Sequence, residues 1–291
     1  MSHGRSQRRK AVLGQHFLVN TGVARDIVAA LGDVRASAVI EVGPGKGALT
    51  RPLLEACARV VAVEIDPALA DDLELEMPPG PASGRGELAL VRGDATRIPW
   101  RELLALASAG GIESSVPLAA NLPYESGTAI LLDWMAASAA DTRLDRAVVM
   151  LQLEVAQRLV AKPRSEAYGS LGALAACTHR VKPLMKVGPG SFRPQPKVWS
   201  QVVALVARPD PLFSPEERTR HAPFIQAAFA HRRKQLAVAM NGRDGLDRDA
   251  WRDQLEAQGL PATSRAEEMS PEGLVALSRA ASTAAARRIG A

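Results

Sequence analysis

Short apolar runs alternate with helix-length amphipathic segments through the first half of the chain. The runs predict strands at 39–42, 59–64, 88–91, 116–120 and 146–151. The segments around them predict helices at 23–31, with Thr21 as N-cap, and at 48–57, 66–76, 100–107 and 127–137. Strands that alternate with helices at this spacing are typical of βαβ units. We therefore expect an α/β fold, with a parallel sheet covered by helices on both faces.

Polar residues stand where these predicted strands end. Glu41 is the next-to-last residue of the first strand, and Glu64 ends the second. Asp94 follows the third strand and Asn121 follows the fourth. In open parallel sheets the ligand binds at the carboxyl edge. We expect these four side chains to share that edge.

A glycine-rich loop, Gly43-Pro44-Gly45-Lys46-Gly47, follows the first strand directly. Glycine tolerates positive φ and lets the backbone approach a ligand closely. Glu64, 21 residues after Gly43, is placed to accept hydrogen bonds from both hydroxyls of a ribose. These features fit any adenosine-containing cofactor. They leave open a nicotinamide oxidoreductase and an S-adenosylmethionine methyltransferase.

Three features favour the methyltransferase. The glycine spacing is G-x-G-x-G and not the dinucleotide G-x-G-x-x-G, and Asp94 stands where an adenine amino group could be read. The fourth strand ends in Asn121-Leu122-Pro123-Tyr124, for which a dehydrogenase has no use.

This last motif suits methylation of an amino group on a base. Such an amine is a poor nucleophile because its lone pair is delocalised into the ring. The side-chain oxygen of Asn121 and the carbonyl of Leu122 would accept its two hydrogens, and Pro123 would fix the turn that aims them. Tyr124 would stack on the base and hold it in line with the methyl group, so that positioning supplies much of the barrier reduction.

The second half of the chain changes character. Helices are expected at 152–161 and 169–177, and strands at 180–187 and 202–206, with a proline-rich loop at 188–197 that presents Phe192. After a break at 208–211 the pattern is helical, with capped starts at Ser214 and Ser270. We expect a flexible basic tail at 1–13, a methyltransferase domain at 14–208 and a small helical domain at 209–291.

The composition of the chain indicates what class of partner it binds. The chain carries a net charge of +5 and a pI near 9.5, which suits a polyanion. Its cations gather in the N-terminal tail and in Arg232-Arg233-Lys234. The two cysteines, Cys57 and Cys177, are expected to be buried thiols, with no disulfide or metal site. No run has transmembrane length and no signal peptide is recognisable, so a cytoplasmic protein without a membrane partner is expected.

The sequence resembles the ribosomal RNA adenine dimethyltransferases, the KsgA/RsmA group. The resemblance covers nearly the whole chain, and its motifs are Gly14-Gln15-His16-Phe17-Leu18, Glu41 to Gly47, Asn121 to Tyr124, Leu151 to Ala156, Ser191 to Val198 and Phe229 to Leu236. It implies a Rossmann-like S-adenosylmethionine methyltransferase sheet with a C-terminal α-helical domain that binds rRNA.

The resemblance also implies a cofactor, a substrate and roles for individual residues. The cofactor would be S-adenosylmethionine, contacted at His16, Leu18, Glu41, Gly43, Gly45, Glu64, Asp94 and Asn121. The substrate would be two adjacent adenines in the 3′-terminal hairpin loop of 16S rRNA, within an immature 30S subunit that a monomer modifies. Phe192 would sandwich a flipped base opposite Tyr124. Lys197, Arg232, Arg233 and Lys234 would bind RNA phosphates.

Three positions depart from the family's usual pattern. The family often has Asn at position 16, frequently Arg at 153 and commonly a neutral residue at 125, where this chain has His16, Leu153 and Glu125. The main alternative is a resistance methyltransferase that modifies one adenine of large-subunit rRNA. A second alternative is a ribosome assembly factor whose methylation is secondary.

Overall fold

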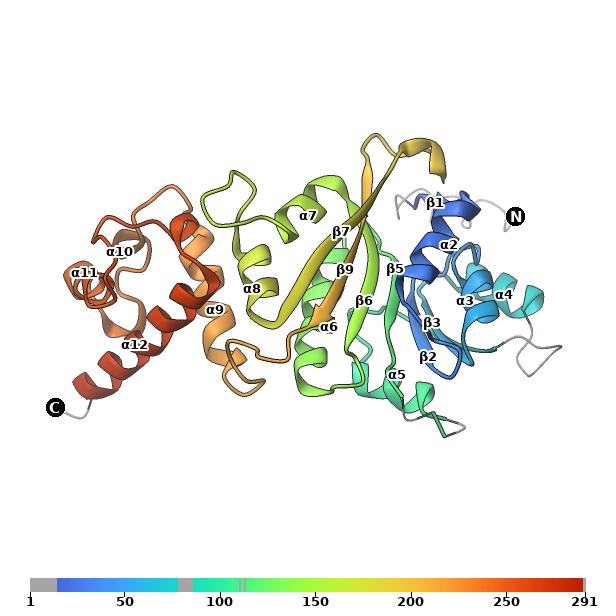
Figure 1. Ribbon diagram of the computed structural model, residues 1–291, viewed down its shortest axis with the longest axis horizontal. Helices are drawn as coiled ribbons and strands as arrows, with labels where there is room; N and C mark the ends of the chain where they lie inside the picture. Colours follow the sequence, from blue (N-terminus) through green and yellow to red (C-terminus); the bar gives the residue numbers. More distant parts are fainter. Residues whose placement is uncertain (1–14, 78–85, 110, 113, 290–291) are drawn as a thin grey trace, which may run out of the picture. The chain divides into compact units, whose positions relative to one another are not determined.

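The computed structural model describes residues 15–77, 86–109, 111–112 and 114–289 of the chain (Figure 1). The chain forms two compact units. The first runs to Ala156 and includes Lys182–Val206, and the second takes Gln157–Val181 and the chain from Ala207 on. The segment 157–181, which the sequence-based boundaries assign to the first domain, thus packs in the second unit. The basic tail expected at 1–13 lies outside the described residues.

Within the described residues a seven-stranded sheet has the order β4-β3-β2-β5-β6-β9-β7. Its strands are β2 (Ala38–Val42), β3 (Arg59–Glu64), β4 (Glu87–Arg92), β5 (Leu118–Asn121), β6 (Arg146–Gln152), β7 (His179–Val187) and β9 (Ser200–Ala207). The first five are parallel, as predicted, and β9 pairs antiparallel with β6. Every residue of β2 is buried, as expected for a parallel strand covered on both faces.

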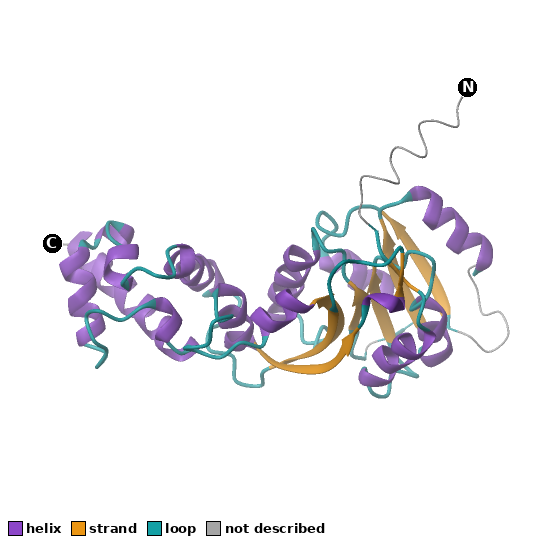
Figure 2. Ribbon diagram, turned by 90° about the horizontal axis from the view of Figure 1, so that it is seen from above, coloured by secondary structure: helices purple, strands orange, loops and turns teal. Residues whose placement is uncertain are grey.

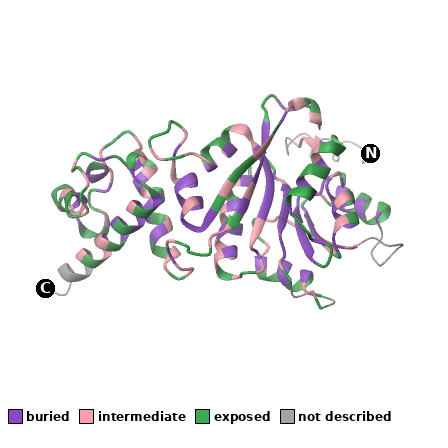
Figure 3. Cartoon of the chain, viewed as in Figure 1, coloured by how far each residue is buried: buried purple, intermediate pink, exposed green. Residues whose placement is uncertain are grey.

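Helices of the first unit lie on both sides of the sheet (Figure 2). They are α2 (Thr21–Ala30), α3 (Thr50–Ala56), α4 (Pro67–Glu76), α5 (Trp100–Ala107) and α6 (Gly127–Ala140), and α7 (Leu153–Leu159) begins in this unit. The N-cap of α2 is Asn20 and not Thr21: the Asn20 side chain accepts from the backbone N–H groups of Gly22 and Val23. Apolar side chains between the helices and the strands form the core, and the central strands are buried along their length (Figure 3).

A second, two-stranded sheet joins the start of the chain to the proline-rich loop. Strand β1 (Phe17–Leu18) pairs antiparallel with β8 (Phe192–Arg193), directly after the short 3-10 helix η1 (Pro189–Ser191). The Val19 N–H extends the pairing by donating to the carbonyl of Ser191 at 2.8 Å. The sequence pattern predicted a loop here, and pairing fixes that loop against the N-terminal segment.

The second unit is helical, as predicted. It contains α8 (Ser170–Thr178), α9 (Arg218–Ala230), α10 (Leu236–Ala239), α11 (Arg248–Glu256), α12 (Pro271–Ile289) and the 3-10 helices η2 (Arg243–Gly245) and η3 (Ala266–Glu268). Helix α9 packs against α8 and α12. The capped start at Ser270 is confirmed, because Ser270 Oγ accepts from the N–H of Gly273 in α12. Ser214 and Glu217 exchange backbone-to-side-chain hydrogen bonds, but α9 begins only at Arg218 with Glu217 as its N-cap, so the predicted helix start at Ser214 is wrong by four residues.

Candidate active site

The four polar strand ends share one edge of the sheet. The strand order reverses between β2 and β5, and such a switch point opens a crevice at the carboxyl ends. The Gly43 N–H donates to the Val63 carbonyl at 3.0 Å, and the Gly93 N–H donates to the Glu64 carbonyl at 2.9 Å. Glu41, Glu64, Asp94 and Asn121 therefore lie at the carboxyl ends of the adjacent strands β2, β3, β4 and β5, along one edge of the sheet as predicted.

The glycine loop has the backbone that only glycine adopts easily. Gly43, Gly45 and Gly47 have φ values of +70°, +55° and +73°. A Cβ on Gly45 would stand 2.9 Å from Cδ1 of Phe17, so the β1 segment lies directly over the loop. The Lys46 ammonium lies 5.1 Å from the centroid of the Phe17 ring. Sequence reasoning missed Phe17 as part of the site, and its position between His16 and Leu18 was the available signal.

Glu64 holds the loop from the neighbouring strand. One carboxylate oxygen accepts from the Gly45 N–H at 3.0 Å and the other from the Asp66 N–H at 2.8 Å. The side chain is buried, and burial raises its pKa above the ordinary value. Each oxygen retains lone pairs for further donors.

Glu41 is a buried carboxyl without a full set of partners. It is 1% exposed, and its Oε2 has no hydrogen-bond partner among the residues that the structure describes. Burial, assisted by the charge of Glu64, raises its pKa to about 8.

Asp94 is held by the turn that follows it. Its Oδ1 accepts from the N–H of Thr96 at 2.9 Å and from the Thr96 hydroxyl at 2.7 Å. The Thr96 hydroxyl is the main reason why the pKa of Asp94 lies below its ordinary value. Asp94 is thus an ionised acceptor at the rim of the edge, and its contact with an adenine stays a prediction.

The Asn-Leu-Pro-Tyr turn connects β5 to α6. The Leu122 N–H donates to Met150 of β6 at 3.1 Å, and the Pro123 carbonyl accepts from the N–H of Gly127 at 2.7 Å. The Asn121 Nδ2 lies 3.4 Å from the His16 carbonyl and donates to it. Because this contact uses the amide nitrogen, Oδ1 is the atom left to accept.

Tyr124 is held by one contact of its hydroxyl and one contact of its ring. Its hydroxyl lies 3.3 Å from the Ser200 Oγ, and its ring centroid lies 5.4 Å from that of His16 at an interplanar angle of 36°. The His16 Nδ1 lies 2.7 Å from the Pro194 carbonyl, so the ring of His16 is itself anchored by the proline-rich loop. His16 therefore organises Asn121 and Tyr124 through its backbone and its ring.

Phe192 does not lie open beside Tyr124. Its side chain is fully buried in the core cluster that also contains Leu18, Val187 and Val202. Strand pairing with β1 places it there, because Phe192 stands opposite Leu18 in the register. As placed, Phe192 offers no ring face to a base. Its stacking role stays a prediction that requires the loop to open.

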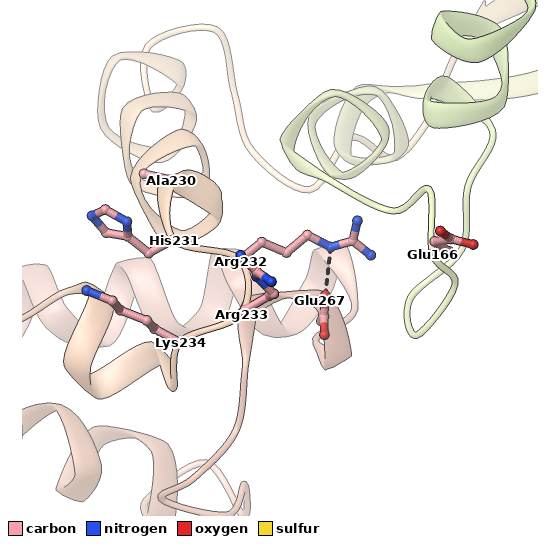
Figure 4. A pocket seen from close by; sticks show the side chains of 7 residues that line it. All are labelled: Glu166, Ala230, His231, Arg232, Arg233, Lys234 and Glu267. Atoms are coloured by element: carbon pink, nitrogen blue, oxygen red, sulfur yellow. Dashed lines mark hydrogen bonds and ion pairs between the residues drawn. The ribbon is translucent and has the colours of Figure 1, made fainter.

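In the second unit, His231, Arg232, Arg233 and Lys234 line a cavity of about 660 Å³ (Figure 4). Arg232 is committed within this unit: its Nε donates to Glu267 at 2.6 Å and its Nη2 to the Ser165 carbonyl at 3.1 Å. The side chains of His231 and Lys234 extend away from that pair (Figure 4). The sequence predicted the same role for Arg232, Arg233 and Lys234, and the structure distinguishes Arg232 by its hydrogen bonds to Glu267 and Ser165.

Comparisons with known proteins show the family of the chain. The family model described as "Ribosomal RNA adenine dimethylase" matches residues 6–262. The chain belongs to the ribosomal RNA adenine dimethylase family. It is 38% identical over 284 residues to the ribosomal RNA small subunit methyltransferase A of Paramagnetospirillum magneticum, with 96% of this chain and 91% of that protein covered. It is 40% identical to the protein of the same name from Mesorhizobium japonicum, with 92% and 91% covered.

Solved structures show the fold of this family member. The dimethyladenosine transferase from Plasmodium falciparum superposes with a TM-score of 0.72 at 20% identity, covering 90% of this chain and 96% of that one. The 23S rRNA methyltransferase ErmE gives a TM-score of 0.63 at 23% identity, covering 90% and 98%. The predicted α/β fold class with its C-terminal helical part is confirmed.

Proposed function

We propose that this chain transfers methyl groups from S-adenosylmethionine to the N6 amino groups of two adjacent adenines in the 3′-terminal hairpin loop of 16S rRNA. The observation that carries the proposal is the Asn121-to-Tyr124 turn at the carboxyl end of β5, with its amide oriented by the His16 carbonyl at 3.4 Å. The two relatives named ribosomal RNA small subunit methyltransferase A support the choice of subunit.

The residues around the switch point fit S-adenosylmethionine. The orphaned, buried Oε2 of Glu41 suits the ammonium group of its amino-acid portion. The glycine loop, which has no Cβ atoms in the way, would allow close backbone approach. Glu64 would accept from the ribose hydroxyls, and Asp94 from the adenine amino group. When bound, the cofactor supplies an electrophilic methyl group.

The turn prepares the substrate amine. We assign Asn121 Oδ1 and the Leu122 carbonyl as acceptors for its two hydrogens, which favours a tetrahedral, nucleophilic nitrogen. Tyr124 stacks on the target base, and its hydroxyl contact with Ser200 fixes the plane of the ring. Positioning and electrostatics therefore supply the rate enhancement, and no strong base is needed before the attack.

We place the RNA phosphates against Lys197, which is exposed in the first unit, and against Arg233 and Lys234 in the second. Arg232 contributes by shaping the cavity through Glu267. The substrate particle we propose is an immature 30S subunit, met in the cytoplasm by a monomeric enzyme. Among the described helices none is long and apolar enough to cross a bilayer.

To test this proposal, the chain is incubated with S-adenosylmethionine that carries a radiolabelled methyl group. The substrates are unmethylated small subunits and, separately, large subunits. Labelling of the small subunit by the wild-type chain, and its loss in Asn121→Ala, is the expected result. Labelling of large-subunit RNA alone would overturn the proposal in favour of the large-subunit enzyme. RNA binding without any labelling would favour an assembly factor.

A further inference from the structure

Trp199 stands apart from the other tryptophans of this chain. The sequence contains four. Trp100, Trp134 and Trp251 are 5%, 0% and 0% exposed, whereas Trp199 is 52% exposed. Exposing half of an indole forgoes the large apolar burial that normally makes tryptophan worth placing in a fold. An exposed ring of this size is available to a partner outside the chain.

The position of Trp199 ties it to the candidate active site. Strand β9 runs antiparallel to β6, so its first residue, Ser200, lies opposite Gln152 at the end of β6. Trp199 immediately precedes this strand, and its carbonyl accepts from the Leu153 N–H at 2.9 Å. Ser200 is the residue whose hydroxyl contacts Tyr124. The backbone of Trp199 is thus fixed one residue away from the contact that positions the proposed stacking ring.

The indole faces outward. Successive side chains of an extended segment point to opposite sides, and Ser200 is 1% exposed where Trp199 is 52% exposed. A Cβ on Gly188 would lie 3.6 Å from Cη2 and Cζ3 of the ring, so the backbone at Gly188 supports the indole. Trp199 therefore points away from the side of the chain on which the Ser200 hydroxyl contacts Tyr124.

Cations flank the indole along the chain. Lys197 precedes it by two residues and Lys186 precedes the supporting Gly188 by two residues, and both side chains are exposed. An aromatic face beside lysines is the combination with which proteins hold single-stranded nucleic acid, because every base has a stackable face and every nucleotide a phosphate. Glu125, which follows Tyr124, is also exposed, and its negative charge is opposite in sign to the charges of these two lysines.

We propose that Trp199 is a stacking subsite for the nucleotide next to the adenine undergoing methylation. The subsite rests on the proposed function, since it assumes an unpaired RNA loop as the substrate. Its task is to hold the flanking base outside the stack so that the loop keeps its register while the target base occupies Tyr124. Trp199 contacts substrate without touching the reacting atoms, so it acts on binding and not on the chemical step.

Methylation kinetics with unmethylated small subunits test the role. Trp199→Ala should raise KM roughly tenfold, within the range for one base–aromatic stack, and leave kcat within about twofold. Trp199→Phe should recover most of the loss. The matched control is Val206→Ala, which trims a 49% exposed apolar residue at the other end of β9 and should leave KM unchanged.

Tryptophan fluorescence gives a second measurement, and RNA would not change it if Trp199 had only a structural role. Since Trp199 alone among the tryptophans is exposed, stacking of a base should quench wild-type emission when a synthetic RNA of the hairpin loop is titrated. A wild-type KM for Trp199→Ala, or emission unchanged at RNA saturation, overturns the subsite. If the wild-type chain leaves small subunits unlabelled, the proposed function fails, and the quenching titration still decides whether RNA contacts Trp199.

Discussion

Replacement of Glu41 by Gln tests why a carboxyl is buried without a partner. With a pKa of about 8, Glu41 carries a proton at pH 7 in roughly 0.9 of the cofactor-free molecules. A cofactor ammonium beside it would favour the ionised form and expel that proton. We therefore expect the wild-type chain to release close to one proton more than Glu41→Gln when S-adenosylmethionine binds at pH 7, and the variant to bind it more weakly.

The same substitution has a signature without cofactor. The folded pKa of Glu41 lies above its ordinary value of 4.5, so the folded state retains a proton that the unfolded chain loses. The stability that Glu41 contributes is complete below pH 4.5 and is lost as the pH rises to about 8. The loss over that window is of order 5 kcal/mol. As the pH rises from 4.5 to about 8, Glu41→Gln should therefore become more stable than the wild type. Below pH 4.5 the stabilities of the two proteins should depend on pH in the same way.

Calorimetry in two buffers of different ionisation enthalpy measures the proton release, and urea unfolding at several pH values measures the stability. Equal proton release by the wild type and by Glu41→Gln would refute the ammonium contact. Parallel stability curves would refute the raised pKa. Glu55→Gln, on the exposed side of α3, is the control and should change neither result.

Three further predictions concern the turn, the loop and the second unit. Asn121→Ala should lower kcat by about 10²–10³ while equilibrium dialysis finds S-adenosylmethionine binding retained; a wild-type kcat would remove Asn121 from the chemistry. Phe192→Ala should lower the free energy of unfolding by about 3–5 kcal/mol, because the ring is fully buried; unchanged urea stability would contradict that core role. Lys234→Ala should weaken rRNA binding and flatten its salt dependence in a filter-binding assay, whereas Arg232→Ala should also lower the melting temperature, since it breaks the pair with Glu267; equal melting temperatures for the two variants would contradict the distinction.

The parallel part of the sheet was predictable because each strand is a continuous apolar run followed by a helix. The residues of β2 and β3 are almost all buried, and the apolar composition of these strands predicts that burial. The polar strand ends followed from the same reading, since the carboxyl ends of parallel strands meet at one edge. The antiparallel pairing of β9 with β6 could not be predicted, because an apolar run indicates a strand but not the direction in which that strand pairs.

The pairing of β1 with β8 was beyond the sequence pattern. Two-residue strands have no periodicity, and Phe17 and Arg193 are joined only by the fold. This pairing decides the position of Phe192, which the motif alone suggested as an open stacking ring and the structure buries. The partner of Arg232 was hidden for a similar reason: Glu267 follows it by 35 residues with no shared motif.

Locating the transferred methyl groups in the rRNA decides whether the chain is a small-subunit adenine dimethyltransferase. Unmethylated small subunits would be treated with the wild-type chain and labelled S-adenosylmethionine, and the rRNA then digested and mapped. We predict N6,N6-dimethyladenosine at two adjacent positions of the 3′-terminal hairpin loop, and about 10²–10³ slower methylation there with Asn121→Ala. Small-subunit rRNA without label, or label on a base other than adenine, would contradict this activity.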